Sequence, residues 1–362
     1  MKNIFKEAIL YEKLNAGAVR CDLCEHKCVI LPAKGSPNLS IFPYLKKENM
    51  GFCGTRTNIN GILYSLTYGK VTSLAVDPVE KKPLYHFFPG ENLLSFGSFG
   101  CNFRCPNCHN WQISQTSSLV HTKPESLNSI LENFSDISPA EIVNQAVENN
   151  CIGIAYTYNE PTISIEFVMD VMKLAKKAKI KNVWITNGFF SDSAREEIFP
   201  YIDAMNVDLK SFDQRFYQSH PKGKLSRVLA NLIKIKESDI HLEVTTLIIP
   251  KFSNNENMLR GIASFIKNKL SRTTPWHLLD FSPEISWQMQ SWQKTSEEEI
   301  KKAYEIGKKE GLKFVYASIT NLANTICPHC KAINIERRNY QIDRFDENGG
   351  CFKCGQNLHI RE

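Results

Sequence analysis

Short apolar runs alternate with amphipathic stretches through the middle of the chain. Strands are predicted where about four to eight mostly apolar residues stand together, and helices where apolar residues recur every three or four positions. Six runs predict strands at 93–99, 152–158, 183–188, 204–209, 242–249 and 276–281, and a later run predicts one more at 312–317. Because strands that alternate with helices form parallel sheets with right-handed crossovers, six βα units are expected. Six units rather than eight favour an open, partial barrel.

Residues typical of helix ends support this pattern. Ser138, followed by a proline and by Glu141 three positions later, predicts a helix N-terminus with a capping box. Thr295 and Glu298 repeat the spacing, and Gly311 predicts the end of that helix.

The chain outside the βα units divides into two smaller regions. Two strand-like runs at 61–68 and 71–76 predict a β-hairpin that turns at Gly69. After residue 320 the chain is too short for a hydrophobic core of its own, so the barrel core should be complete by about residue 317. The predicted organisation is a Cys-rich region with a hairpin at 1–90, a barrel at 91–320 and a small C-terminal module at 321–362.

The composition is that of a soluble globular protein. Of the 362 residues, 42% are hydrophobic and 23% are charged. The chain contains no run of about 18 or more apolar residues, so no membrane span is predicted. Glu7 and Glu12 stand where a signal peptide would need its apolar core, so a cytoplasmic location is expected. The net charge of +6 is spread along the chain and is too weak to indicate nucleic-acid binding.

Eleven of the twelve cysteines fall into three tight sets. The sets are Cys21, Cys24, Cys28 and Cys53; Cys101, Cys105 and Cys108; and Cys327, Cys330, Cys351 and Cys354. Disulfide frameworks belong to small secreted chains, whereas short Cys spacings in a large cytosolic chain indicate metal binding. Cys151 stands alone in an apolar run and is expected to be a buried small hydrophobic residue.

The central set, Cys101-x3-Cys105-x2-Cys108, directly follows the first predicted barrel strand. Three thiolates on one loop can bind three corners of an iron–sulfur cube and leave one iron open to a small molecule. A structural zinc site needs four ligands, and the alternative here is a zinc site with His109 as the fourth. The position is that of a barrel active site, since such sites lie at the carboxyl ends of the strands.

Many segments in one order resemble a known family. They are CDLCEHKCVI, GFCGTRTN, LYSLTYGKVTSLAVDPVEKKPLYHFFPG, GCNFRCPNCHNWQISQ, YTYNEPT, VWITNGFF, MNVDLKSF, LEVTTLIIP, CPHC and CFKC. The chain resembles the AmmeMemoRadiSam system radical SAM enzymes, which are related to the activating enzymes of glycyl-radical enzymes such as pyruvate formate-lyase. This implies a partial (β/α)6 barrel, a 4Fe–4S cluster, and S-adenosylmethionine bound to its open iron and cleaved to a 5′-deoxyadenosyl radical. It also implies protein partners that include Memo-like proteins.

The resemblance implies which polar residues at the strand ends hold S-adenosylmethionine. The segment ending in Asn159, Glu160 and a proline resembles the family's glycine-glycine-glutamate-proline segment, which receives the methionine amino group, although Asn159 replaces a glycine. Ile185 stands where an aspartate often occurs in the activating enzymes, which argues against a cation site there. The candidate cofactor-binding residues are His109, Asn159, Glu160, Asn187, Asp208 and Lys210.

Strand alternation adds two observations of its own. Asp208 and Lys210 should lie on one face at the end of the fourth strand, where they could hold a carboxylate and a ribose hydroxyl, unless they form a surface ion pair. Glu243 and Thr245 alternate on the fifth strand, and either line the cofactor pocket or form a satisfied polar pair in the barrel interior. The charged block at 77–87 could handle substrate, but a solvated connector is favoured.

The two outer cysteine sets are predicted metal sites. The C-terminal spacing C-x2-C-x20-C-x2-C predicts a zinc ribbon. Residues 327–362 contain six lysines and arginines against five acidic residues, so a structural or protein-docking role is favoured over RNA binding. The N-terminal set is open between zinc and a second 4Fe–4S cluster, with zinc slightly favoured because no electron-donor site is evident in the sequence.

The expected function is that of an oxygen-sensitive radical SAM oxidoreductase. Cys101, Cys105 and Cys108 would hold the catalytic cluster, and hydrogen would be abstracted from an unidentified substrate, such as a glycine of a partner protein. The alternative is a non-enzymatic iron–sulfur or zinc carrier or scaffold, which has no need of cofactor-binding polar residues at neighbouring strand ends.

Overall fold

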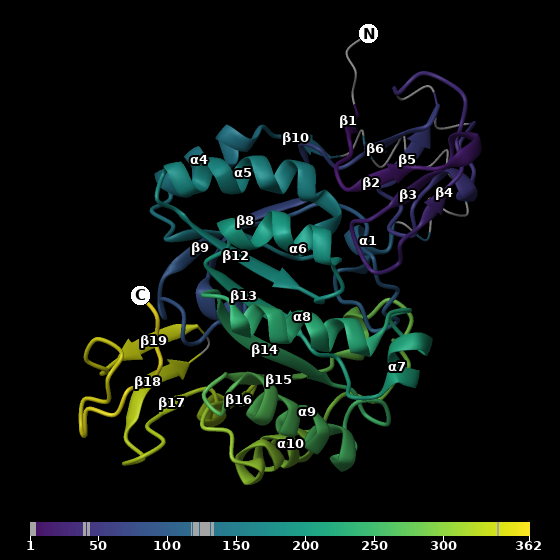
Figure 1. Ribbon diagram of the computed structural model, residues 1–362. Coiled ribbons are helices and arrows are strands. Elements are labelled where there is room, and N and C mark those ends of the chain that lie inside the picture. Colours follow the sequence, from purple (N-terminus) through teal and green to yellow (C-terminus); the bar gives the residue numbers. More distant parts are fainter. Residues whose placement is uncertain are drawn as a thin grey trace.

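The structure is a computed structural model that describes residues 5–38, 41, 44–116, 118, 123, 131, 134–338 and 340–362. A large curved sheet with its helices forms the centre, small N-terminal sheets lie at one end and a small C-terminal sheet lies beside the opposite part (Figure 1). No helix among these residues is long and apolar enough to cross a membrane.

The central sheet has eight strands in the order β16-β15-β14-β13-β12-β11-β9-β8. Their bounds are β8 Ser73–Pro78, β9 Asn92–Gly97, β11 Gly153–Tyr156, β12 Lys181–Thr186, β13 Ala204–Asp208, β14 His241–Ile248, β15 Trp276–Asp280 and β16 Val315–Ala317. All neighbours are parallel except β8 and β9, which are antiparallel. The seven predicted strands are therefore confirmed to within a few residues, in an α/β fold with a mostly parallel sheet.

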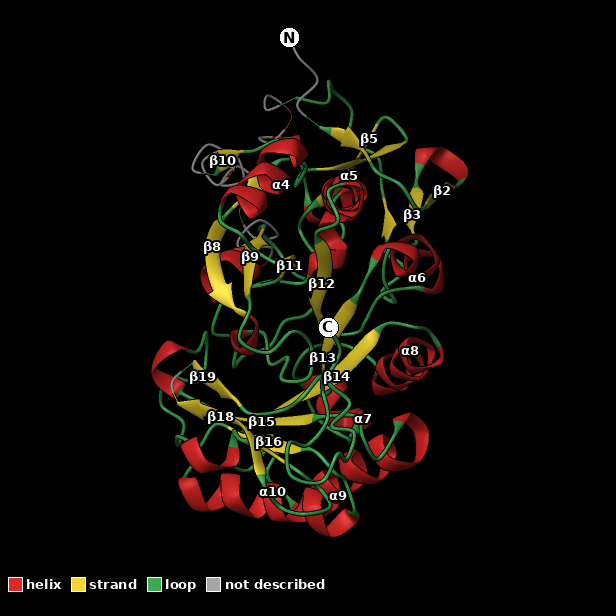
Figure 2. Cartoon of the chain, turned by 90° about the vertical axis from the view of Figure 1, so that its left-hand side faces the viewer, coloured by secondary structure: helices red, strands yellow, loops and turns green. Residues whose placement is uncertain are grey.

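Helices cover the convex side of this sheet (Figure 2). They are α4 Pro139–Glu148, α5 Ile165–Lys177, α6 Asp192–Ile198, α7 Gln214–Ser219, α8 Leu225–Glu237, α9 Glu256–Phe265 and α10 Glu297–Glu310. The largest cluster of buried apolar residues includes Ile154, Trp184 and Trp276 together with apolar residues of these helices. The capping box of Ser138 and Glu141 is confirmed at the start of α4.

The predicted cap of α10 is wrong by one residue. Ser296 and Glu299 form the capping box, and the helix ends at Gly311 as expected, with φ +96°. Thr295 has another task, because its hydroxyl donates to the carbonyl of Ile248 (2.5 Å) and accepts the N–H of Phe281 (2.8 Å). A hydroxyl that pairs with two backbone groups between strands is not available to cap a helix.

The concave side of the sheet is filled by the segment that follows β8. Apolar residues of this segment pack against one inward-facing residue from each of four neighbouring strands. The cluster consists of Val79, Leu84 and Phe87 on Leu93, Ala155, Val183 and Ala204. Asp77, Glu80 and Lys82 are each no more than 4% exposed. The prediction of a solvated connector at 77–87 is therefore wrong, because the block lies inside the barrel and its charges are paired there.

Glu243 and Thr245 belong to this interior. Glu243 is fully buried, and four donors saturate its carboxylate: the N–H groups of Tyr85 (3.0 Å) and His86 (2.8 Å), and the rings of His241 (2.9 Å) and His277 (2.6 Å). Thr245 donates to the Asn206 side chain at 2.8 Å. Both residues are thus satisfied polar groups of the barrel interior rather than parts of a cofactor pocket.

The N-terminal region consists of short strands in small sheets. They are β1 Lys6–Glu7, β2 Tyr11–Lys13, β3 Val19–Cys21, β4 Val29–Ile30, β5 Arg56–Ile59, β6 Ile62–Ser65, β7 Lys70–Val71 and, from later in the chain, β10 Ser135–Asp136. The predicted hairpin of 61–68 with 71–76 is wrong. Instead β6 pairs with β5 across Asn60 and Gly61, both at positive φ, while β8 joins the central sheet. Asn-Gly is the stronger hairpin signal, since both residues tolerate positive φ.

The C-terminal sheet consists of β17 Thr325–Ile326, β18 Ile333–Arg338 and β19 Gln341–Arg344. Arg337 is 3% exposed and donates to the carbonyl of Tyr85 (2.8 Å) and to the Thr325 hydroxyl (2.8 Å). The His86 ring contacts the carbonyl of Leu358 at 2.8 Å. The buried apolar core of the barrel ends at Ala317, as expected, but the C-terminal segment covers buried polar groups of the barrel.

Candidate active site

The central triad lies on the loop after β9, at the carboxyl ends of the parallel strands. Gly100 precedes it at φ +80°, and a side chain there would lie 2.7 Å from the Cys53 carbonyl, so only glycine fits. Cys101 and Cys105 are each 8% exposed, and Cys108 is partly buried. The loop thus presents three shielded thiols at the edge where barrel enzymes bind their ligands.

The three thiols are close enough to affect one another electrostatically. Burial raises the pKa of Cys101, and negative charge on Cys105 raises it further. Burial also raises the pKa of Cys105 to about 12, although Lys210 opposes this shift. The Cys108 sulfur lies 3.0 Å from the Ser114 hydroxyl. Three crowded, shielded thiols become thiolates when a metal cluster neutralises them, so the chemistry of this donor set fits an iron–sulfur cluster.

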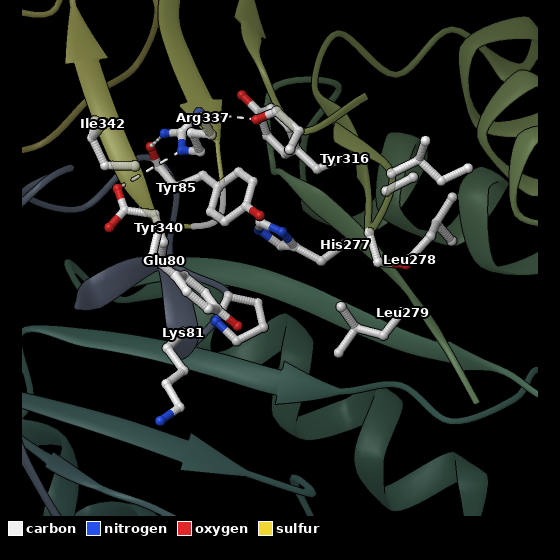
Figure 3. Close-up of a pocket in the computed structure, with 15 residues that line it drawn as sticks. Glu80, Lys81, Tyr85, His277, Leu278, Leu279, Tyr316, Arg337, Tyr340 and Ile342 are labelled. Carbon is white, nitrogen blue, oxygen red and sulfur yellow. Dashed lines mark hydrogen bonds and ion pairs between the residues drawn. The ribbon is translucent and has the colours of Figure 1, made fainter. Parts of the chain in front are cut away.

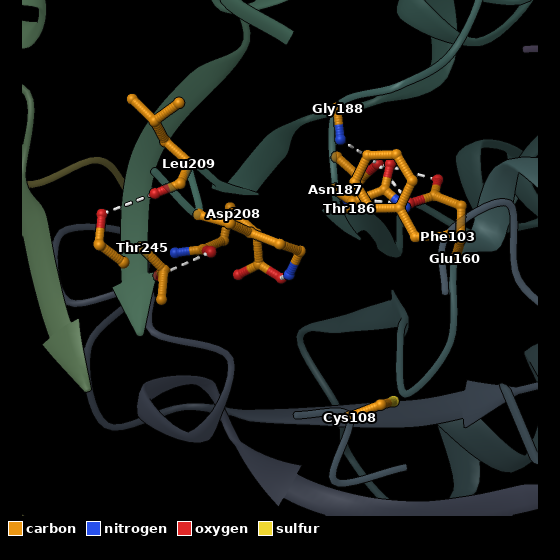
Figure 4. A network of polar contacts seen from close by, with 12 residues as sticks. Phe103, Cys108, Glu160, Thr186, Asn187, Gly188, Asp208, Leu209 and Thr245 are labelled. Atoms are coloured by element: carbon orange, nitrogen blue, oxygen red, sulfur yellow. Dashed lines mark hydrogen bonds and ion pairs between the residues drawn. The ribbon is translucent and has the colours of Figure 1, made fainter. Parts of the chain in front are cut away.

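Glu160 joins the ends of two neighbouring strands. It is 2% exposed, and Figure 4 shows Thr186, Asn187 and Gly188 gathered around it. Its carboxylate accepts the hydroxyl of Thr186 (2.8 Å), the N–H of Asn187 (2.8 Å), and the hydroxyl (2.5 Å) and N–H (3.2 Å) of Thr162. Four donors fill the lone-pair positions of one carboxylate. A cofactor amine would therefore have to displace one of these donors, and Glu160 acts here first as a positioning residue.

Two asparagines extend this network to the triad loop. Asn159 accepts the N–H of Ser98 (3.2 Å) and donates to the carbonyl of Gly100 (2.9 Å). Asn187 donates to the side chain of Asn102 at 2.7 Å. The replacement of a glycine by Asn159 thus adds a side chain that fastens the end of β11 to the residue before Cys101.

Asp208 and Lys210 lie on one face, as strand alternation predicts. The Lys210 ammonium lies 2.8 Å from the Asp208 carboxylate, and both side chains are partly buried rather than fully exposed. Burial lowers the pKa of Lys210, but the charges of Asp208 and Cys105 outweigh it and raise the pKa overall. Lys210 is therefore a fixed positive charge beside the triad, and the alternative of a plain surface pair is not favoured.

His109 follows the triad directly. Its Nε2 is buried and has no hydrogen-bond partner among the described residues. The ring stacks against Phe281 at 6.3 Å, and burial lowers its pKa. A neutral imidazole with a free nitrogen could pair with a polar group of a bound ligand.

The N-terminal four-cysteine site comprises Cys21, Cys24, Cys28 and Cys53. Three of these are no more than 9% exposed, and Cys28 is partly buried. Burial raises the pKa of Cys24, and charges on Cys28, Cys21 and Cys53 raise it further, so the fold gathers all four. The N–H of Phe52 donates to Cys28 (3.4 Å) and the Thr55 hydroxyl donates to Cys53 (3.0 Å).

The C-terminal four-cysteine site comprises Cys327, Cys330, Cys351 and Cys354, whose sulfurs lie within 4.8 Å of one another. The pairs Cys327–Cys354 and Cys330–Cys351 are 3.6 and 3.5 Å apart. This spacing suits one tetrahedral metal ion. The Asn334 side chain donates to Cys351 at 3.4 Å, an outer contact that fixes a ligand.

A cavity of ≈ 310 Å³ lies where the barrel, the 79–88 segment and the C-terminal sheet meet (Figure 3). Its wall includes Glu80, Tyr85, His277, Tyr316, Arg337 and Tyr340. Lys81 also lines it and pairs with Asp77 at 2.6 Å, and the hydroxyl of Tyr158 donates to the same Asp77 at 2.8 Å. The cavity wall is thereby connected to the segment that carries Asn159 and Glu160.

Sequence reasoning missed Asn102 and the cavity. Asn102 is fully buried between two triad cysteines, and its carbonyl accepts from the His26 ring at 2.7 Å. Its position inside the C-x3-C spacing was the only available signal. No sequence signal indicated the cavity, because its residues come from segments that are far apart in the chain. Tyr85 and Arg337, for example, are separated by 252 positions.

The chain is similar in sequence to several known proteins. A sequence model described as "Radical SAM superfamily" matches residues 96–266. The uncharacterized protein MJ0808 of Methanocaldococcus jannaschii is 38% identical over 363 residues, which cover 98% of this chain and 99% of that protein. Pyruvate formate-lyase-activating enzyme of Clostridium pasteurianum is 25% identical over 170 residues, 47% of this chain and 67% of that enzyme. A solved domain of pyruvate-formate lyase-activating enzyme from Bacteroides vulgatus is 20% identical, with a TM-score of 0.41 over 46% of this chain and 99% of that domain.

Proposed function

We propose that the chain, whose residues 96–266 match the radical SAM superfamily, cleaves S-adenosylmethionine reductively and uses the resulting radical to abstract hydrogen from a protein or peptide substrate. One observation carries the proposal: two buried thiols and one partly buried thiol lie on a single loop at the carboxyl ends of the strands, with Lys210 beside them. The superfamily match and the similarity to activating enzymes support the same reaction.

Cys101, Cys105 and Cys108 would hold a 4Fe–4S cluster, which supplies one electron for the cleavage of bound S-adenosylmethionine. The other residues position the cofactor. Lys210 offers its ammonium to the carboxylate of S-adenosylmethionine, and Asp208 keeps that ammonium in place. Asn159, Glu160 and Asn187 hold the ends of β11 and β12 against the triad loop, and the free Nε2 of His109 offers a further polar contact.

The relatives and the cavity support this substrate class. Relatives include activating enzymes of pyruvate formate-lyase, so we infer a protein or peptide partner, with a backbone glycine as one candidate for hydrogen abstraction. The cavity beside Tyr85 and Arg337 has room for a side chain or a short loop rather than a folded domain. The resemblance to the AmmeMemoRadiSam system adds Memo-like proteins as proposed partners.

We propose zinc for the C-terminal four-cysteine site. Sulfur pairs 3.5 and 3.6 Å apart support a single tetrahedral ion. Residues 321–362, with their four thiols and short strands, then form a ribbon whose folding depends on the metal.

The test is anaerobic. Purified protein should be brown, and its reduced form should give a cluster signal in electron paramagnetic resonance that changes when S-adenosylmethionine is added. Cys105→Ala should abolish the change and the formation of 5′-deoxyadenosine, whereas Cys151→Ala, a buried cysteine outside the three sets, should retain both. Retention of the S-adenosylmethionine-dependent signal in Cys105→Ala would contradict the ligand assignment. A carrier or scaffold, the less favoured alternative, would form no 5′-deoxyadenosine in either protein.

A further inference from the structure

We propose that the N-terminal four-cysteine site binds a second iron–sulfur cluster and relays electrons to the cluster of the central triad. This inference deepens the proposed function and rests on it. Its grounds are the spacing of the thiols, their contact with the triad loop and the hydrogen bonds that they receive.

The spacing separates this site from the C-terminal one. A tetrahedral zinc ion with Zn–S bonds of about 2.3 Å holds its sulfurs about 3.8 Å apart. The C-terminal sulfurs meet this requirement, and they form the only group of three or more Cys, His, Asp or Glu ligand atoms within 4.8 Å among the residues that the structure describes. The thiols of Cys21, Cys24, Cys28 and Cys53 affect one another electrostatically, as do those of Cys101, Cys105 and Cys108, but among the described residues no three sulfurs of either set lie within 4.8 Å of one another. A cluster places several irons between its thiolates and so requires the wider spacing.

The N-terminal site and the triad loop are in direct contact. The carbonyl of Cys53 packs against Gly100 so closely that a side chain there would lie 2.7 Å from it, and Gly100 is bonded to Cys101. One van der Waals contact therefore separates a ligand residue of one site from a ligand residue of the other. Electron transfer weakens steeply with distance, so such a contact is suited to it.

Two side chains fasten the sites together. Arg104, within the triad motif, donates to the carbonyls of Cys101 (2.9 Å) and Phe52, and its guanidinium lies 4.1 Å from the centre of the Phe52 ring. From the other side, His26 contacts the carbonyl of Asn102 at 2.7 Å and packs on Phe52 with ring centres 4.3 Å apart. His26 lies between two N-terminal ligands and Arg104 between two triad ligands, so each site braces the other. A purely structural metal site needs no such contact with the catalytic loop.

Polar groups around the N-terminal thiols favour a charged cluster. Cys28 accepts the N–H of Phe52 and Cys53 accepts the Thr55 hydroxyl. The Arg56 guanidinium lies 4.0 Å from the Cys21 sulfur and is fully buried in an ion pair with Glu166. Hydrogen bonds to the sulfurs and nearby charge are among the features that set the reduction potential of iron–sulfur clusters.

The electron balance is simple. A low-potential one-electron donor of the flavodoxin class is oxidised by one electron and reduces the N-terminal cluster by one. That electron then passes to the triad cluster, which returns the N-terminal cluster to its oxidised form. No proton or bond changes partners in these two steps.

The first experiment counts metals in the full chain purified without oxygen. We expect about eight iron and about one zinc per chain, whereas a zinc ion at the N-terminal site would give about four iron and about two zinc and would overturn the proposal. The triple variant with Cys101, Cys105 and Cys108 replaced by alanine should keep about four iron per chain. In its reduced form it should give a cluster signal that does not change when S-adenosylmethionine is added. If the triple variant keeps its iron but the wild type never responds to S-adenosylmethionine, the proposed function fails while the second cluster stands.

The second experiment tests the relay. In the double variant Cys24→Ser, Cys28→Ser, formation of 5′-deoxyadenosine driven by reduced flavodoxin should fall far more than formation driven by dithionite, a small reductant that can reach the triad directly. Cys151→Ser serves as the matched control and should leave the ratio of the two rates unchanged. An unchanged ratio in the double variant, after loss of its N-terminal iron has been verified, would overturn the relay. Should that variant fail to fold, the wild-type metal count still decides the identity of the cluster.

Discussion

The backbone N–H of Asn187 donates a 2.8 Å hydrogen bond to Oε2 of Glu160, which joins the ends of β12 and β11 at the candidate active site. This contact makes the shape of the cofactor site depend on a carboxylate that the protein itself saturates. Its removal should therefore affect folding and cofactor binding together.

Glu160→Gln should lower both stability and the affinity for S-adenosylmethionine. An amide has one acceptor oxygen and places an NH2 group against donors that the carboxylate now accepts. Loss of hydrogen bonds to a buried charged group costs about 1.5–3 kcal/mol in the free energy of unfolding, measurable by urea denaturation without oxygen. The exposed Glu196 on α6 offers the control Glu196→Gln, which should change neither quantity. Wild-type stability in Glu160→Gln would contradict a positioning role.

Lys210→Met should weaken S-adenosylmethionine binding while the cluster stays in place. Lys210 contacts Asp208 at 2.8 Å and is not a predicted ligand of the triad cluster. Removal of one charge-assisted contact corresponds to roughly a ten- to hundredfold loss of affinity. Titration of the cluster signal with the cofactor measures this loss, and Lys251→Met, at an exposed lysine after β14, is the control. Equal affinities in the two variants would remove Lys210 from the site.

Arg337→Met should loosen the C-terminal segment from the barrel. The side chain is buried, bonds the carbonyl of Tyr85 and lies 3.8 Å from Glu80, so its loss leaves a buried carboxylate without its cation. Breaking such a pair costs about 3–5 kcal/mol. Limited proteolysis should cleave residues 321–362 sooner, and urea denaturation should show the loss. Arg338→Met removes the neighbouring, exposed arginine, which pairs with Glu336, and should leave both measurements unchanged.

The stability should fall as the pH drops below about 6.5. Burial lowers the pKa of His86 to about 3, whereas the same group in the unfolded chain has a pKa of about 6.5. Between these two pKa values the unfolded state binds a proton that the folded state does not bind. The free energy of unfolding therefore falls by at most about 1.4 kcal/mol for each pH unit of acidification.

His86→Gln tests this origin of the pH dependence. Glutamine can still pair with the carbonyl of Leu358 and the hydroxyl of Tyr316, the two groups that His86 contacts, but it does not titrate. Unfolding free energies measured at pH 7.5 and at pH 5.5 should differ less in the variant than in the wild type. A slope equal to that of the wild type would assign the effect to other groups.

The parts of the fold set by local pattern were predictable from the sequence. Apolar periodicity located the seven parallel strands β9 and β11 to β16, and cysteine spacing located the three thiol sets. Local signals failed where two residues compete for one role: Thr295 has the spacing of a cap, yet a contact with Ile248 on a distant strand claims its hydroxyl. The hairpin error differs, because the local signal of Asn60 and Gly61 was the stronger one, and β8 pairs instead with β9.

The candidate site was predictable as a set of residues but not as a set of contacts. Strand alternation was sufficient to pair Asp208 with Lys210. It could not show that Glu160 is saturated, since its donors Thr162, Thr186 and Asn187 come from two strand ends. The burial of the 77–87 block was hidden for a similar reason: a charged sequence looks solvated until the partners of each charge are known, and those partners are tertiary.

The bond between His86 and Leu358 has a consequence for the order of folding. It joins residues 272 positions apart, and the carbonyl of His86 also accepts the N–H of Arg361, almost at the end of the chain. During synthesis the barrel strands leave the ribosome long before their interior segment can obtain these partners. Contacts between such remote positions slow folding and prolong the exposure of incomplete surfaces. The nascent chain should therefore hold an unfinished barrel until Leu358 and Arg361 have been made.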